Sequence, residues 1–99
     1  MIRHIALLTL NADAPEGQSD IIVKALRDLP SAISELANYV VSQDMGLAEG
    51  NADIAVVADF ANRDDYEVYR THPAHVAVIR DSILPFSAGR SAVQHEMPV

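Results

Sequence analysis

The most informative stretch of this chain is Tyr69-Arg70-Thr71-His72-Pro73-Ala74-His75-Val76. The residue before a proline disfavours the α conformation, so we predict that a helix carrying Tyr69 ends near Thr71 or His72. Pro73 suits the first turn of a following helix, where its missing N–H costs no hydrogen bond. The corner between the two helices is therefore expected to bring the side chains of Tyr69 and His75 together.

Two interpretations of this pair stay open. Imidazole titrates near neutrality, so His75 has the right chemistry for a general base that takes a proton next to a carbonyl. Tyr69 would then donate a hydrogen bond to the enolate oxygen that forms. Alternatively, both residues only pack at the corner, with His75 bonded to a backbone carbonyl and Tyr69 covering apolar surface.

The other two histidines of interest also have two interpretations each. His4 lies on one face of an apolar strand, and it is either a pocket residue or a satisfied interior histidine. His72 either caps the helix that begins at Pro73 or contacts a ligand. The His72-x-x-His75 spacing is compatible with a metal ion, but no third ligand is evident, so no metal site is predicted.

Three further polar residues are interpreted as structural. We expect Asp53 and Asp59, on the third predicted strand, to be solvated strand ends rather than a catalytic pair of carboxylates. His95, near the end of the chain, is expected on the surface or in a contact between two copies.

Outward from the corner, the hydrophobic pattern predicts the order strand, helix, strand, strand, helix pair, strand. Asp13 and Glu16 resemble a capping box for the first helix. Val76, Ile79 and Ile83 repeat at helical spacing and are expected to form the buried stripe of the last helix. The expected strands are 2–10, 38–43, 53–60 and 90–96, and the expected helices are 16–29, 62–72 and 73–84.

This order is typical of an α+β, ferredoxin-like βαββαβ fold with a four-stranded antiparallel sheet. Its helices cover one sheet face, yet the strands at 2–10 and 53–60 carry apolar side chains on both faces. A second copy packed sheet to sheet is the simplest cover for the other face. We therefore expect a homodimer, with a barrel-like interior between the sheets where a ligand could sit.

Composition excludes several classes of function. The 99 residues fit one domain, 1–99, and the formal charge of −7 disfavours nucleic-acid and anionic membrane surfaces. The absence of cysteine excludes disulfides and thiol catalysis. No stretch has transmembrane length, and the apolar N-terminus is too short for a signal peptide, so a cytoplasmic protein is expected.

The Ile2-Arg3-His4 opening, the segment 49–60 and the His72-Pro73-Ala74-His75 corner occur in this order along the chain. With these elements the chain resembles the stress-responsive A/B barrel domain, also called the dimeric α/β barrel (Dabb), over essentially its whole length. The resemblance implies a ferredoxin-like domain that dimerises into a barrel.

The resemblance also implies candidate site residues. In the plant enzyme olivetolic acid cyclase, a member of this family, the catalytic tyrosine and histidine have the same spacing as Tyr69 and His75, and a pocket histidine matches His4. A further pocket histidine of that enzyme falls near Asp53 or Ile54, where this chain has none.

The leading hypothesis is a homodimer that holds a small, mostly apolar carbonyl compound between helices and sheet. A cofactor-free cyclase, lyase or isomerase would use His75 as base and Tyr69 as oxygen-binding donor, with His4 and His72 shaping the pocket. The alternative is a non-enzymatic stress-response or ligand-binding protein.

Overall fold

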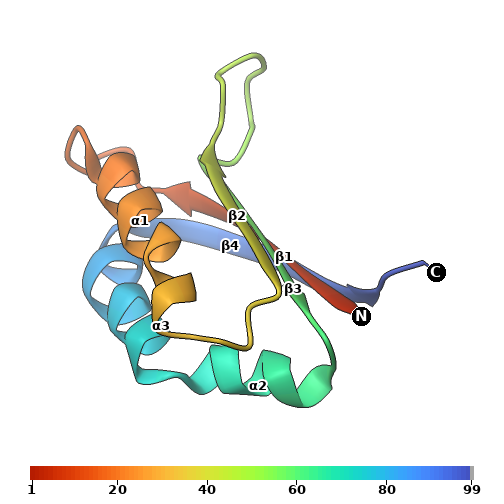
Figure 1. Cartoon of the computed structure of the whole chain (residues 1–99). Coiled ribbons are helices and arrows are strands. Elements are labelled where there is room, and N and C mark those ends of the chain that lie inside the picture. The colour runs from red at the N-terminus through yellow and green to blue at the C-terminus, as the bar shows by residue number, and fades with distance from the viewer. Residues whose placement is uncertain (99) are drawn as a thin grey trace.

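The computed structural model describes residues 1–98, and Figure 1 shows their arrangement. The elements follow the predicted order, so the ferredoxin-like α+β fold is confirmed. The strands are β1 (Ile2–Leu10), β2 (Asn38–Gln43), β3 (Ile54–Phe60) and β4 (Ser87–Glu96). The α-helices are α1 (Gln18–Arg27), α2 (Arg63–Thr71) and α3 (Pro73–Val78), and the shorter turns are η1 (Leu29–Ser31), η2 (Ile79–Ile83) and η3 (Leu84–Phe86).

The four strands form one antiparallel sheet in the order β2-β3-β1-β4. All helices lie on one face of this sheet (Figure 1). The core fills the space between that face and the helices, because the buried side chains of β1 and β3 meet those of α1 and the turn that follows it. Its largest fully buried members are Phe60, Ile22, Leu26, Ile33 and Ile54.

The other face of the sheet, which we call the open face, is not covered by any helix among residues 1–98 (Figure 1). Leu7, Val40 and Val93 on this face are 42%, 50% and 51% exposed. Ile5 and Val57 beside them are half-buried. The predicted apolar side chains on both faces of β1 and β3 are therefore present, and those of the open face contact water in the single chain.

The predicted capping box of the first helix is wrong. The helix begins at Gln18, two residues later than expected, and its N-cap Gly17 makes no side-chain hydrogen bond. Gly17 has a φ of 88°, and a left-handed residue cannot continue a right-handed helix. Asp13 and Glu16 therefore lie in the connection before the helix.

The last strand begins at Ser87, three residues before the predicted Arg90. Leu10 pairs with Ser87 and Thr9 with Gly89, so the long first strand supplies partners for the extra residues. Strand pairing over this distance in sequence has no local signature.

The last helix is irregular, and this changes its buried stripe. A π turn, η2, follows α3 directly, and the Gln18 side chain donates to the Ser82 carbonyl at 2.9 Å. Ile83 is buried, whereas the predicted stripe residue Val76 is 42% exposed. His75 precedes Ile79 by four residues, which places both on one helix face, and both are half-buried. His75, and not Val76, therefore continues the line of Ile79 and Ile83.

Asp59 is not a solvated strand end, which corrects the prediction. Asp59 is 3% exposed, and its carboxylate accepts two hydrogen bonds from Arg3, at 2.8 and 3.0 Å, and one from Asn38 at 3.2 Å. Asp53 is also bound, because its carboxylate accepts the Leu10 N–H at 2.7 Å. Arg3 and Asn38 hold the pKa of Asp59 below its usual value.

We expect Asp59→Ala to lower the free energy of unfolding by about 2 kcal/mol, because it removes a charged, bidentate pair and leaves Arg3 without its partner. Urea denaturation would measure this loss. Asp81→Ala is the matched control, since the Arg80–Asp81 pair has the same bidentate geometry but lies on the exposed surface. Equal effects of the two substitutions would contradict the prediction.

A candidate active site between helices and sheet

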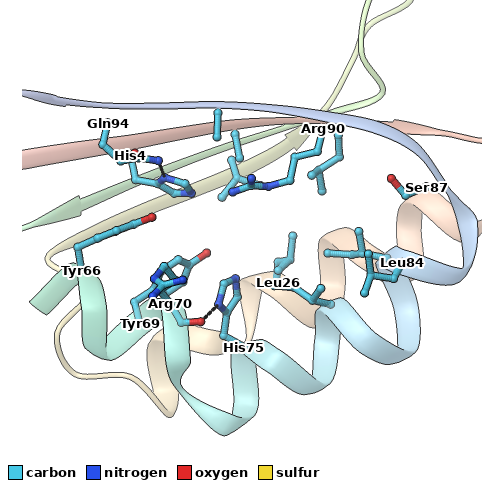
Figure 2. Close-up of a pocket in the computed structure, with 16 residues that line it drawn as sticks. His4, Leu26, Tyr66, Tyr69, Arg70, His75, Leu84, Ser87, Arg90 and Gln94 are labelled. Atoms are coloured by element: carbon cyan, nitrogen blue, oxygen red, sulfur yellow. Dashed lines mark hydrogen bonds between the residues drawn. The ribbon is translucent and has the colours of Figure 1, made fainter.

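A cavity of about 580 Å³ lies between the helices and the covered face of the sheet (Figure 2). Small-molecule sites have this size. Most of its lining is apolar, and its polar side chains come from both layers, as Figure 2 shows. The lining residues are His4, Ala6, Leu8, Leu26, Val56, Tyr66, Tyr69, Arg70, His75, Ile79, Ile83, Leu84, Ser87, Arg90, Ala92 and Gln94.

This cavity is separate from the ligand space that we expect between two paired sheets. A ligand space between two paired sheets would lie on the open face, whereas this cavity is on the helix side and is lined by one chain. Small side chains explain the space, because Ala6 and Ala92 form neighbouring parts of its sheet wall. A cavity is therefore present between helices and sheet, where we expect the ligand, and the ligand itself stays a prediction.

The helix corner has the predicted geometry. Helix α2 ends at Thr71, His72 is extended with a ψ of 134°, and Pro73 is the first residue of α3. The corner brings Tyr69 and His75 together, with their rings stacked at a centroid distance of 4.1 Å and an interplanar angle of 25°. Both side chains line the cavity.

His75 is placed to act as a base. Its Nδ1 lies 3.4 Å from the Arg70 carbonyl oxygen, which can only accept, so the proton of the neutral ring is on Nδ1. Nε2 is then unprotonated, and Figure 2 shows the ring pointing into the cavity. Burial lowers the pKa of His75, so the ring is neutral at pH 7.

Tyr69 is 2% exposed, and its hydroxyl lies 3.2 Å from that of Tyr39 on β2. Burial raises the pKa of both tyrosines, so both keep their protons at neutral pH. When Tyr39 donates to the Tyr69 oxygen, the Tyr69 O–H is left to donate to a ligand. Tyr39 was not predicted as part of the site, because its strand gave no indication of which helix it faces.

Both interpretations of His4 apply, since its side chain is hydrogen-bonded inside the protein and also lines the cavity. The Gln94 amide donates to its Nδ1 at 2.8 Å, which places the proton of the neutral ring on Nε2. The ring packs against Tyr66 and Tyr69, with centroids 5.4 and 6.1 Å away. Burial foremost, with the nearby charge of Arg90, lowers the pKa of His4 to about 4. His4 is therefore a neutral hydrogen-bond donor.

Acid should weaken the fold through His4. Its pKa falls from 6.5 in the unfolded chain to about 4 in the folded one, so the unfolded state binds more protons between these values. Stability is then unaffected above pH 6.5 and falls as the pH drops towards 4. The full difference is worth ~3 kcal/mol, and we expect roughly 2 kcal/mol because the cavity lets water near the ring. Urea denaturation at several pH values would show that acid lowers the free energy of unfolding less in His4→Gln than in the wild-type protein. An equal loss in both proteins would refute the prediction.

His72 does not line the cavity, so its suggested contact with a ligand stays a prediction. Its Nδ1 accepts the Ala74 N–H at 3.1 Å and caps α3, which was the other interpretation. No three His, Asp or Glu side chains gather as metal ligands in the described part of the chain. Among the same residues, no helix is long and apolar enough to cross a membrane.

The family model for the stress responsive A/B barrel domain (Dabb) matches residues 2–97. The chain belongs to the Dabb family. A dimeric ferredoxin-like protein of unknown function from Thermobifida fusca YX is 45% identical, with a TM-score of 0.88, and the match covers 97% of this chain and 90% of that one. A dimeric protein of unknown function with a ferredoxin-like fold, from Bacteroides fragilis NCTC 9343, is 30% identical, with a TM-score of 0.86 and coverage of 97% and 95%.

A more distant likeness concerns the fold alone. A hydroxynitrile lyase from Passiflora edulis is 15% identical, with a TM-score of 0.83, and the match covers 98% of this chain and 93% of that chain. A comparison with curated proteins finds no match.

The sequence did not predict five polar residues of this Dabb protein's cavity, namely Tyr66, Arg70, Ser87, Arg90 and Gln94. Arg90 and Gln94 enter the site because Arg90 pairs with Leu8 and Gln94 with His4 in the β1–β4 ladder. The alternation of residues 90–96 did place Arg90 and Gln94 on one strand face. Assigning that face to the cavity required knowing the partner strand and its register.

Proposed function

We propose that this Dabb protein is a homodimer that binds a small carbonyl compound in its helix-side cavity and moves a proton next to the carbonyl without a cofactor. The observation that carries the proposal is the stacked pair of His75 and Tyr69 on the cavity wall, with Nε2 of His75 unprotonated. The reaction class is a lyase, isomerase or cyclase.

The proton transfer uses groups that already have the required protonation states. His75 Nε2 takes a proton from the carbon next to the carbonyl, the C–H electron pair forms the enolate double bond, and the carbonyl π pair moves to oxygen. The Tyr69 hydroxyl or the Nε2–H of His4 donates to that oxygen. Where the enolate is conjugated with a C=C bond, protonated His75 returns the proton to the far carbon of that system and completes an isomerisation. In an aldol cyclisation the enolate carbon attacks a second carbonyl, the π pair of that carbonyl moves to its oxygen, and this oxygen takes the proton from protonated His75.

One relative supports the reaction class. The Passiflora edulis protein is a hydroxynitrile lyase by name, so the fold accommodates lyase chemistry in at least that protein. Its identity to this chain is 15%, and the argument for the residues therefore rests on the cavity itself.

The second candidate is a ligand-binding protein without turnover. It is favoured by the Tyr69 hydroxyl, which is buried and already hydrogen-bonded to Tyr39. In this case the stacked pair would only shape the cavity.

The homodimer is supported by two observations. The Thermobifida fusca and Bacteroides fragilis structures are described as dimeric. In this chain the open face leaves Leu7, Val40 and Val93 in water, and a second copy packed on it would bury them. The exposed Met45 and Leu47 of the loop between β2 and β3 extend the apolar surface beyond the sheet.

Deuterium exchange distinguishes the two candidates. NMR in D₂O would follow the hydrogens next to the carbonyl of acetophenone and 2-heptanone, with benzophenone, which has no such hydrogen, as a binding control. The enzyme hypothesis predicts faster exchange with the protein than in buffer at the same pH. Binding of these ketones without any acceleration would support the ligand-binding protein instead.

A further inference from the structure

The charges of the cavity differ from those of the whole protein. The chain has 14 acidic and seven basic residues, excluding histidine. The cavity lining nevertheless contains two arginines, Arg70 and Arg90, and no aspartate or glutamate. The site is therefore positively charged in an acidic protein.

Only one of the two arginines is available to a ligand. The guanidinium of Arg70 is paired with Glu67 at 3.1 Å on the exposed surface of α2. Arg90 forms no ion pair and no side-chain hydrogen bond with any residue of the described chain, residues 1–98. Figure 2 shows its guanidinium extending from β4 into the cavity, on the same side as His4.

The positive charge of Arg90 also shifts the pKa values of the proposed reacting groups. Its charge contributes to the lowered pKa of His4 and of His75, and it opposes the rise in the pKa of Tyr69. These three groups lie on β1, α3 and α2, so the guanidinium faces the site from the sheet side. An anion bound to Arg90 would offset its charge and make His75 a stronger base.

We propose that the ligand of this cavity carries a carboxylate in addition to its carbonyl, and that Arg90 binds this carboxylate. The proposal deepens the proposed function, because it rests on the same cavity as the ligand site. The planar guanidinium offers two parallel N–H donors, which match the two oxygens of a carboxylate. A phosphate group is less suited, since the chain has no glycine-rich cradle of backbone N–H groups.

The rest of the lining suits the remainder of such a ligand. Leu8, Leu26, Ile79 and Ile83 supply apolar walls for a hydrocarbon part. The substrate class is therefore a small, largely apolar oxo acid, held at its carboxylate by β4 and presented at its carbonyl to α2 and α3.

A matched pair of probes tests the proposal. 4-Oxo-4-phenylbutanoate and its methyl ester differ only in the charge of the carboxyl group, and isothermal titration calorimetry would measure both affinities. We expect the wild-type protein to bind the acid at least about tenfold more tightly than the ester, since a charge-assisted bidentate pair is lost in the ester. Arg90→Gln should abolish this preference and leave the affinity for the ester within about twofold.

Arg80→Gln is the control, because it removes the same charge from an exposed pair outside the cavity and should keep the preference. The proposal is overturned if wild type binds acid and ester equally, if it binds neither, if the preference survives Arg90→Gln, or if inorganic phosphate competes as well as the acid. If the protein accelerates deuterium exchange of the ketones but binds acid and ester equally, the proposed function stands and only the carboxylate-binding role of Arg90 is refuted. If the protein prefers the acid through Arg90 but does not accelerate deuterium exchange, the carboxylate site stands and only the proposed catalysis is refuted.

Discussion

Replacing His75 with glutamine should slow the protein-dependent exchange of hydrogens next to a ketone carbonyl by about 100-fold to 10,000-fold, the usual effect of removing a general base. Glutamine is a good helix former of similar size, so α3 should remain folded. The loss would come from the missing Nε2, which is the one basic atom that the corner presents to the cavity. NMR in D₂O at saturating ketone would measure the change in rate.

The control is His95→Gln, because His95 is exposed on β4 and does not line the cavity. Tyr69→Phe should reduce the rate less, since His4 supplies a second donor for the oxygen. The pH profile gives an independent check: burial lowers the pKa of His75, so the midpoint of the decline in rate on acidification should lie below pH 6.5. Exchange by His75→Gln at a rate within threefold of wild type would eliminate His75 as the base.

Leu7→Asp should convert the proposed dimer into a monomer, with a rise in the dissociation constant of roughly 1,000-fold or more. Leu7 lies on the open face of a central strand, between Ala55 on β3 and Ser91 on β4. In a two-fold interface the substitution removes two apolar side chains and introduces two carboxylates, each of which costs free energy when taken out of water. Sedimentation velocity at about 10 µM would measure the change.

Ile21→Asp is the matched control. Ile21 is 54% exposed, more than Leu7, but it lies on α1, on the opposite side of the sheet. The dimer should survive this substitution. A monomeric wild-type protein, or a Leu7→Asp protein that still sediments as a dimer, would refute the sheet-to-sheet assembly.

These two predictions are independent because of where the cavity lies. Its lining comes from one chain and from the covered face of the sheet, whereas the expected interface is the open face. A monomeric Leu7→Asp protein should therefore still bind a ketone in the cavity. This separation would not hold if the ligand space lay between two sheets, as the sequence first suggested.

The sequence by itself determined the order of the elements, the two apolar faces of the sheet and the pairing of Tyr69 with His75. Each of these depends on short-range physics. Hydrophobic periodicity acts within one element. The fixed φ of Pro73 ends one helix and starts the next, and the stacked rings follow from that corner.

Only the tertiary structure decided the rest of the site. Gln94 orients His4 across 90 residues, Tyr39 bonds Tyr69 across 30, and Arg90 enters the cavity from the last strand. These contacts depend on which strands pair and in what register, and register is set by the packing of the whole sheet against the helices. Local patterns therefore identified the proposed base His75 and its partner Tyr69. The pairing of β4 with β1 brings Arg90 to the cavity, and we expect the charge of Arg90 to select the ligand.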